Sequence, residues 1–302
     1  MSVSRRTDLA IEAQELWQES ADEITELPGV ESREYTREGC PVTRVKILDE
    51  DGAEALGKPP GTYVTVAFEG LTMRDEEGMA SLTSAIAAEL SDLLPDMPVY
   101  ATVLVAGLGN RDITPDAIGP FCLENTVVTR HLVDLHPEHF GHMRPVAALA
   151  PGVLGSTGME SADIIRALAE KLKPACVILV DALASRKLSR LCRTVQLADS
   201  GLVPGGGVGN ARAALTEQAL SAPVISVGVP TVVEAGTLVS DLLEELGHEI
   251  PEKLFQSVGG GLVVTPKEID TQVRDAARVT GRAISLALQP SLKYQDLASY
   301  LS

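Results

Sequence analysis

The sequence predicts an α/β fold in which one mostly parallel, twisted sheet is covered by helices on both faces. Between residues 101 and 288, short runs of Val, Ile, Leu and Ala alternate with amphipathic helical patterns, as expected for βαβ units. Of the 302 residues, 45% are hydrophobic and only 3% are aromatic, so the chain can bury a large, mainly aliphatic core. No internal repeat or long linker divides the chain, and we therefore predict a single domain.

The elements before residue 100 follow a less regular pattern. Residues 9–26 have an acidic helical pattern, and residues 29–39 show no clear period. Residues 42–48 and 62–68 alternate between polar and apolar side chains, which predicts two strands. The helix that follows has an apolar face consisting of Met79, Leu82, Ile86, Leu90 and Leu93.

The segment ATVLVAGLGNRDITPDAIGP contains the central strand, loop and helix. The apolar run 103–106 predicts a buried strand. Thr114 is a suitable N-cap and Pro115 a suitable first helical residue, so Asp116 is expected in the first turn of a helix. The buried face of this helix, which Pro120 should kink, is predicted to consist of Ile118, Phe121, Cys122, Val128 and Leu132.

Strands and helices alternate regularly after residue 145. Apolar runs predict strands at 146–149, 175–180, 194–197, 224–229 and 262–264. Helical patterns extend over 161–172, from Pro230-Thr231 to about residue 246, and over 269–288. The last helix is predicted to begin with a capping box at 265–268 and to bury Ile269, Val273, Ala276, Ile284 and Leu288. Glycine-rich loops are expected at 155–158 and 204–210.

Two aspartates follow buried strands at corresponding places. Asp116 comes after the strand at 103–106, and Asp181 stands at the end of the strand at 175–180. If these strands are neighbours, both carboxylates face one crevice, because ligands bind at the carboxyl ends of parallel strands. Two close carboxylates do not both ionise easily, so the pair could activate a water against an amide. The structural alternative is that Asp116 interacts with a helix dipole and Asp181 caps a loop.

The glycine and histidine motifs are weaker indications of a functional site than the two aspartates. The glycines of Gly107-x-Gly109 and of 207–209 lack the third glycine of a dinucleotide fingerprint, and no P-loop is present in the sequence. His136, His139 and His142 are spaced like metal ligands, but proline and glycine interrupt any helix that would align them. We predict a solvated loop there, no metal site and no cofactor.

Composition limits the class of protein. The net charge of −17 argues against direct binding of nucleic acid or an anionic membrane. Cys40, Cys122, Cys176 and Cys192 are widely spaced, which predicts reduced thiols. The sequence has no signal peptide at its start and no apolar run near the roughly 20 residues that span a bilayer. These features predict a cytoplasmic protein.

Several long runs resemble the germination protease (spore protease) family of spore-forming bacteria: GLGNRDITPDAIGP, ENTVVTRHL, RPVAALAPGVLGSTGMESADII, VILVDALASR, GVGN, GVPTVVEAGT and LVVTPKEID. The resemblance implies an atypical aspartic endopeptidase that degrades small acid-soluble, DNA-binding spore proteins in the spore core. It implies the fold of the hydrogenase-maturation proteases (phosphorylase/hydrolase-like) and a homotetramer. The family's two proposed active-site aspartates fall on Asp116 and Asp181, and a metal held by this acidic pair is the alternative mechanism.

The resemblance also implies a zymogen. Family members trim their own N-terminus at a site that imitates the substrate motif Thr-Glu-Ile/Phe-Ala-Ser-Glu, and here TDLAIE at 7–12 occupies that place. It implies cleavage between Asp8 and Leu9, a propeptide at 1–8 and a protease domain at 9–302. The chain lacks a longer segment that relatives have between residues 247 and 261.

The predicted mechanism uses Asp116 and Asp181 to activate a water, with mild acidification as the hypothesised trigger of self-cleavage. Backbone donors that could shape the substrate site belong to Gly107, Gly109, Asn110, Thr157 and Gly158. The competing class is a non-catalytic module that binds a peptide or small ligand in the same crevice.

Overall fold

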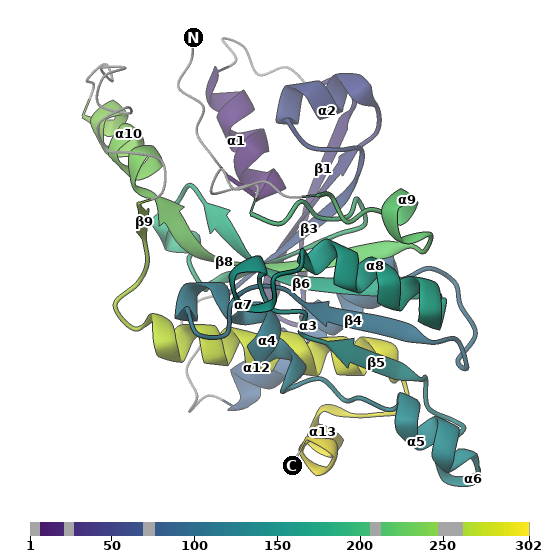
Figure 1. The fold of residues 1–302 in the computed structure, drawn as a ribbon. Coiled ribbons are helices and arrows are strands. Elements are labelled where there is room, and N and C mark those ends of the chain that lie inside the picture. The colour runs from purple at the N-terminus through teal and green to yellow at the C-terminus, as the bar shows by residue number, and fades with distance from the viewer. Residues whose placement is uncertain (1–6, 21–26, 69–75, 206–212, 247–261, 302) are drawn as a thin grey trace.

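The computed structural model describes residues 7–20, 27–68, 76–205, 213–246 and 262–301, and these contain a nine-stranded sheet. The strand order is β1-β2-β3-β7-β8-β6-β4-β5, with β9 paired to β8 (Figure 1). The strands are β1 Val30–Arg37, β2 Cys40–Ile47, β3 Gly61–Ala67, β4 Val103–Gly107, β5 Val146–Leu149, β6 Cys176–Ser185, β7 Thr194–Ala198, β8 Val224–Glu234 and β9 Val263–Val264.

Short and long helices surround this sheet. The α-helices are α1 Ala10–Ser20, α2 Glu50–Leu56, α3 Glu76–Leu93, α4 Ile118–Leu123, α5 Arg130–Leu135, α6 Pro137–Phe140, α7 Leu154–Thr157, α8 Ser161–Leu172, α9 Glu217–Leu220, α10 Ala235–Glu245, α12 Ile269–Leu288 and α13 Leu297–Tyr300. The 3₁₀ turns are η1 Thr114–Asp116, η2 Leu188–Arg190 and η4 Tyr294–Asp296. In the described parts of the chain, no helix combines the length and the apolar character needed to cross a bilayer.

The predicted α/β class is confirmed, and the sheet is mixed. β5, β4, β6 and β8 are parallel to one another. β7, β3, β2 and β1 continue the sheet with antiparallel pairings, and β9 is antiparallel to β8. The parallel half contains the strands whose apolar runs are most continuous, as expected for strands that are covered on both faces.

One face of the sheet is covered by α3, α4 and α12. Val103 and Val105 of β4 point to this side and pack with Ile86 of α3, Phe121 of α4 and Ile284 of α12 in the largest core cluster. Because successive side chains of a strand alternate between faces, the residues between these valines point to the other side. Four of the five residues predicted for the apolar face of α12 are buried, and Ile269 packs against the same cluster.

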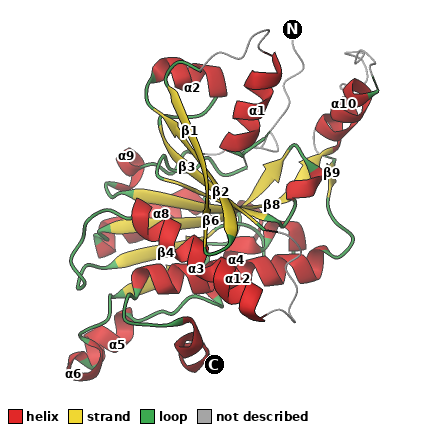
Figure 2. Cartoon of the chain, turned by 180° about the vertical axis from the view of Figure 1, so that it is seen from behind, coloured by secondary structure: helices red, strands yellow, loops and turns green. Residues whose placement is uncertain are grey.

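The second face is covered in two separate patches. At one end, α8 and α9 pack on β4, β6 and β8 through Ile165 and Leu220. At the other end, α1 and α2 pack on β2, β3 and β7 through Ala10 and Leu56. Figures 1 and 2 show α1 and α2 grouped beside β1, well apart from α8. Two cavities lie in the gap between the patches, and both reach Asp181 of β6.

Three strands differ from the sequence-based expectation. Residues 29–39 were expected to be irregular but contain β1, an edge strand whose side chains are mostly exposed and polar, so no apolar alternation marks it. β6 was expected to end at Asp181 but continues to Ser185. Pro230-Thr231 was expected to open a helix, yet β8 runs through it to Glu234 with every residue buried.

Tertiary pairing explains the long β8. Its second half pairs with the second half of β6, and the register shifts between Leu183 and Ala184, where Thr231 is the additional residue. Such a bulge accommodates Pro230, which has no N–H for the ladder. The Thr231 hydroxyl donates to Pro115 O at 2.6 Å, so the bulge also holds the turn that carries Asp116.

The single helix predicted after Thr114 is divided into three short helical elements. The 3₁₀ turn η1 is followed by the short helix α4, and α5 starts only at Arg130. Pro120 is the third residue of α4, where a missing N–H costs no hydrogen bond, and so it produces no kink. Val128 and Leu132 lie beyond α4 and are partly exposed, which corrects the prediction that they belong to its buried face.

Two predicted local motifs are also different. Residues 155–158 were expected to be a loop, but most of them belong to the single turn α7. The capping box at 265–268 is absent, because Glu268 is the N-cap of α12 without a side-chain cap bond, and the Thr265 hydroxyl instead donates to Thr231 O at 3.1 Å. The predicted helix over 9–26 is described up to Ser20, as α1. Residues 21–26, part of the glycine loop at 204–210 and the short region at 247–261 lie outside the described residues.

Candidate active site

Asp116 and Asp181 line the same cavity, which has a volume of about 430 Å³. Asp116 belongs to η1 and is half-buried, whereas Asp181 is only 6% exposed within β6. Oδ2 of Asp116 accepts a hydrogen bond from Asn110 N at 2.8 Å, and Oδ1 of Asp181 accepts one from Ala182 N at 2.9 Å. A main-chain N–H group therefore fixes the orientation of each carboxylate, as a preorganised acid–base pair requires.

The loop before Asp116 requires a glycine at position 109. Its φ is +103°, and a Cβ there would overlap the Asp116 carbonyl oxygen. Only glycine permits both the backbone conformation and the close approach. Gly107 has a different role, because a Cβ there would overlap Gly119 O, so this glycine lets β4 pack against α4.

Asp181, Gly228 and Gln196 form one row across three neighbouring strands. Asp181 of β6 is in register with Gly228 of β8, and Gly228 is in register with Gln196 of β7. The two polar side chains therefore flank a position that has no side chain. Neighbouring strands are about 4.8 Å apart, so the Cα atoms of Asp181 and Gln196 are separated by about 10 Å. The side chain of Leu183 covers the Gly228 position between them.

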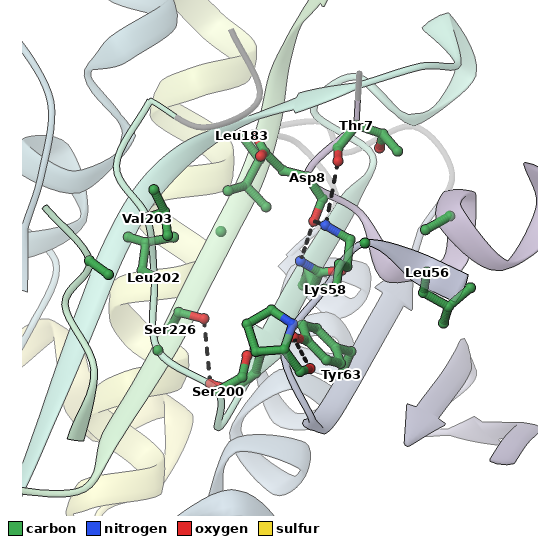
Figure 3. Close-up of a pocket in the computed structure, with 18 of the residues that line it drawn as sticks. Thr7, Asp8, Leu56, Lys58, Tyr63, Leu183, Ser200, Leu202, Val203 and Ser226 are labelled. Atoms are coloured by element: carbon green, nitrogen blue, oxygen red, sulfur yellow. Dashed lines mark hydrogen bonds between the residues drawn. The ribbon is translucent and has the colours of Figure 1, made fainter. Parts of the chain in front are cut away.

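The second cavity, of about 900 Å³, meets the first one at Asp181. Thr7 and Asp8 at the start of the described chain line it, together with Lys58 and Gln196. Figure 3 shows Asp8 between Leu183 of β6 and Lys58, on the open side of the sheet. The N-terminal segment thus passes through the gap between the two patches of helices.

β6 continues beyond the end of β4, and one of its edges is open there. Leu108 N still donates to Val180 O at 2.8 Å, just after β4 ends. Further along this edge, the amides of Ala182, Ala184 and Arg186 donate to side-chain carboxylates. An open strand edge presents unpaired main-chain groups, so these carboxylates take the place of a neighbouring strand.

Two of the three carboxylates on this edge come from the N-terminal segment. The acceptors are Asp181 Oδ1, Asp8 Oδ2 and Glu12 Oε2, at 2.9, 2.8 and 2.6 Å from their donors. Asp8 N also donates to Ala184 O at 2.9 Å, so Asp8 binds β6 through its main chain and its side chain. This edge accepts an acidic residue of an extended peptide.

Glu12 anchors the start of α1 and is fully buried. Its carboxylate accepts bonds from Lys187 N and Arg190 Nη1, both at 3.0 Å, and from the Thr7 hydroxyl at 2.5 Å. The neighbouring Glu15 pairs with Arg190 at 2.7 Å. Arg190 and its hydrogen bond lower the pKa of Glu15 against the effect of burial, so the ion pair is retained at neutral pH.

The remaining predicted site residues lie at different distances from this arrangement. Gly109 lines the smaller cavity, and the Asn110 amide is engaged by Asp116. Among the residues that the structure describes, the linings of the two cavities do not include Gly107, Thr157 or Gly158. The Thr157 hydroxyl donates to Val153 O and Met159 O, and thus supports its own turn.

Sequence reasoning missed four residues that line the cavities: Lys58, Gln196, Glu160 and Ser161. Gln196 had a usable signal, because a buried amide inside an apolar strand needs hydrogen-bond partners. Lys58 lies in a turn, and no feature of the sequence around it indicated a role in the site.

The predicted histidine loop and thiols can also be located. His136 and His139 are exposed around α6, each within 4 Å of Glu138. Within the described residues, no three His, Cys, Asp or Glu side chains are grouped as metal ligands would be. All four cysteines are buried and free. Burial raises the pKa of Cys122, Cys176 and Cys192 to about 12.

Comparisons with known proteins agree on one family. A family model described as "Germination protease" matches residues 10–257. A germination protease of Caldanaerobacter subterraneus subsp. tengcongensis is 44% identical, with 98% of each chain covered. Those of Clostridium tetani (39%; 99% of this chain and 100% of the relative) and Bacillus cereus (36%; 98% and 97%) are also similar.

A solved structure, the [NiFe] hydrogenase maturation protease HycI from Thermococcus kodakarensis KOD1, is 17% identical and aligns with a TM-score of 0.36. The alignment covers 65% of this chain and 98% of that one. A TM-score this low does not establish a shared fold.

Proposed function

The chain belongs to the germination protease family, and from this premise we propose that it is a self-processing endopeptidase with Asp116 and Asp181 as its catalytic pair. Membership itself makes the protein a protease of spore germination. The proposal adds the aspartic mechanism, the zymogen and the substrates, which are small acid-soluble spore proteins. The observation that carries it is that Asp116, Asp181 and Asp8 line one cavity.

The proposed reaction is hydrolysis by an activated water. One carboxylate of the pair removes a proton from a water, whose oxygen attacks the carbonyl carbon of the peptide bond. The other supplies a proton to the leaving nitrogen when the C–N bond breaks. General acid–base catalysis of this kind typically contributes about 10²–10⁴-fold for each proton transfer.

Self-processing is proposed at the bond between Asp8 and Leu9. Asp8 is hydrogen-bonded to Ala184 of β6 and lines both cavities, as Asp181 does, and Leu9 is fully buried. The bond therefore sits at the junction of the two cavities. Protein substrates would enter the same gap once Thr7 and Asp8 have left it.

The test replaces Asp116→Asn and Asp181→Asn separately. Intact mass spectrometry follows the removal of residues 1–8, and a peptide with Thr-Glu-Ile-Ala-Ser-Glu reports cleavage in trans. Each variant should lose at least about 100-fold in both rates, because it removes one proton-transfer step. Asp112→Asn, an exposed aspartate of the same loop, is the matched control and should cut normally.

Three outcomes decide between the alternatives. Normal cleavage by both Asn variants would exclude the aspartate pair. Peptide binding without cleavage by the unaltered protein would favour the non-catalytic module. Loss of activity with a chelator, restored by a divalent metal, would favour a metal on the acidic pair.

Acidification is the proposed trigger of self-cleavage. Protonation of one carboxylate of a close pair creates the acid that the leaving nitrogen requires. The new N-terminus should therefore appear faster as the pH falls from 7.5 to 5.5. A trimming rate that is independent of pH would contradict this trigger and leave the aspartate pair itself untouched. Assembly into a tetramer is proposed from the family and can be measured by analytical ultracentrifugation.

A further inference from the structure

We propose that Lys58 and Gln196 form the donor pair that polarises the carbonyl of the bond being cut and holds the oxyanion of its tetrahedral intermediate. The inference rests on the proposed self-cleavage between Asp8 and Leu9. It assigns catalytic roles to two residues outside the aspartate pair, from separate parts of the chain.

The geometry matches an oxyanion site. Lys58 Nζ donates to Asp8 O at 3.0 Å, and Gln196 Nε2 donates to the same oxygen at 3.0 Å. Figure 3 shows the Lys58 amine directed at this carbonyl and at that of Thr7, which it reaches at 3.4 Å. Effective oxyanion donors lie about 2.7–3.1 Å from the oxygen that gains charge, and both donors fall within that range.

The orientation of the Gln196 amide is determined by its second partner. Gln196 Oε1 accepts a bond from Ala10 N at 2.7 Å, and this oxygen cannot donate. The amino group must therefore point at Asp8 O, on the other side of the bond to Leu9. One side chain thus binds the peptide on both sides of the proposed cleavage point.

Lys58 is held in place by the turn that carries it. Gly57 ends α2 in the left-handed conformation, with φ of 63°, and turns the chain toward the cavity. The following Pro59 is fixed through its carbonyl, which accepts a bond from the Tyr63 hydroxyl at 2.8 Å. A lysine on such a turn is positioned by the backbone on both sides of it.

The surroundings of Lys58 suit a hydrogen-bond donor to a group that gains negative charge. Nζ donates to the main-chain carbonyls of Thr7 and Asp8, and no carboxylate of the described residues is bonded directly to it. Burial lowers the pKa of Lys58, while Asp8 and Glu12 nearby act in the opposite direction. A desolvated amine donor next to a carbonyl interacts more strongly with a developing oxyanion than it would in water.

The chemical step balances with these residues. The water oxygen forms a bond to the Asp8 carbonyl carbon, and the π electrons of the carbonyl move to its oxygen, which the two donors hold. The proton of the water passes to one carboxylate of the Asp116–Asp181 pair. The C–N bond then breaks, the nitrogen of Leu9 receives a proton, and the products are a new carboxyl group and a new amine.

The row of residues across the sheet supports this assignment. Asp181 and Gln196 lie on the two strands that flank β8 at Gly228, and both line the larger cavity together with Asp8, the residue that Gln196 binds. Asp181 and Gln196 therefore face one cavity from different strands of the sheet. An acid–base pair and oxyanion donors around one bond are the arrangement that amide hydrolysis requires.

The experiment follows trimming of the full-length precursor in Lys58→Met, Lys58→Arg and Gln196→Glu. Gln196→Glu keeps an acceptor for Ala10 N but removes the donor. Lys58→Met and Gln196→Glu should each slow the appearance of the Leu9 N-terminus by about 10²–10³-fold, the usual loss for one oxyanion donor. Lys58→Arg retains charge and donors and should recover a large part of that loss. Lys46→Met, an exposed lysine on β2, is the control and should trim normally.

Peptide cleavage in trans gives a second readout. The loss should appear mainly in kcat and not in KM, because the donors act on a charge that exists only in the transition state. Far-ultraviolet circular dichroism and the melting temperature identify variants that have simply failed to fold, and Lys58→Arg and Gln196→Glu still test the pair if Lys58→Met unfolds.

Different results would contradict the proposed self-processing and the proposed donor pair. If the unaltered precursor is never cut between Asp8 and Leu9, the proposed self-processing is wrong. If it is cut there, and folded Lys58→Met and Gln196→Glu variants trim within about twofold of its rate, the donor pair is overturned while the aspartate mechanism stands.

Discussion

Gly228 shows how much of the site depends on a single missing side chain. It lies between Asp181 and Gln196 in the row across β6, β8 and β7. A Cβ at this position would overlap the buried side chain of Leu183. Close packing against Leu183 of β6 therefore leaves no room for a side chain at this position.

Substitution Gly228→Ala should lower both stability and trimming. Overpacking of a close-packed site costs about 1–3 kcal/mol, and displacement of Leu183 disturbs the cavity that the peptide enters. Urea unfolding measures the first effect and mass spectrometry the second. Gly155→Ala is the control, because a Cβ at Gly155 meets no atom within 4 Å. Equal unfolding midpoints for the two variants would contradict the packing argument.

Substitutions of Asp8 test whether the open edge of β6 recognises an acidic residue. Its carboxylate accepts the Ala184 amide, and its own amide donates to Ala184 O. Asp8→Asn keeps an acceptor but loses the charge, whereas Asp8→Leu loses both. Trimming should fall in that order, by about 10-fold or more for Asp8→Leu, since a hydrogen bond to a charged group is worth about 1.5–3 kcal/mol. Faster trimming of Asp8→Leu than of Asp8→Asn would refute this role of the strand edge.

At the scale of elements, α3 is attached to the β1–β2 hairpin by one buried carboxylate. Glu89 is fully buried and accepts hydrogen bonds from Tyr35 Oη at 2.8 Å, Arg37 Nη1 at 3.0 Å and Arg44 Nη2 at 2.9 Å. These bonds join the helix to an edge of the sheet whose own side chains are mostly exposed.

Glu89→Gln should therefore destabilise the protein by about 1–3 kcal/mol, because charged donors lose their buried acceptor. Asp92→Asn is the matched control on the same helix. Asp92 also bonds Arg37, at 2.6 Å, but its side chain is 48% exposed, and exposed pairs contribute about 0–1 kcal/mol. The comparison uses the free energy of unfolding in urea, and a larger loss for Asp92→Asn would contradict the expectation.

At the scale of the whole molecule, the buried thiols couple stability to alkaline pH. Cys122, Cys176 and Cys192 each have a pKa raised to about 12 by burial, whereas an unfolded thiol ionises near pH 8.5. As the pH rises, the unfolded chain loses these protons first. The free energy of unfolding should thus be unaffected by the thiols below about pH 8 and should fall progressively above pH 9.

The measurement compares urea unfolding at pH 8 and pH 10 for the unaltered protein and for a triple Cys→Ala variant. Each thiol contributes up to about 1.4 kcal/mol per pH unit in this range, so the unaltered protein should lose more stability on alkalisation than the variant does. A similar loss in both would show that other groups, such as Tyr63, dominate. Native thiols should also resist alkylation at pH 8.

Much of the fold could be predicted from local patterns. Continuous apolar runs marked β4, β6, β7 and β8, because strands in the interior of a sheet are buried on both faces. The edge strand β5 also has an apolar run, although most of its residues are only partly buried. The exposed edge strand β1 carries no such signal. Pro230 predicted the end of β8 on local grounds, but the bulge opposite β6 accommodates it.

The residues of the candidate site also fall into two groups, those that local sequence patterns predict and those that they do not. Asp116 and Asp181 could be chosen from the sequence because each follows an apolar run and a glycine or strand boundary. Lys58 and Gln196 could not, since they lie 50 and 188 residues from Asp8, the residue they bind. No periodicity within a segment predicts a contact of that separation.

The sequence by itself determined the α/β class, the positions of most strands and helices, and the two aspartates, because each depends on the spacing of apolar and special residues over a few turns of chain. Only the tertiary structure decided the strand order, the extension of β6 past β4, and the passage of Thr7 and Asp8 through the gap between α1 and α8. Those features arise from register and from contacts between distant segments, which local hydrophobic periodicity does not specify.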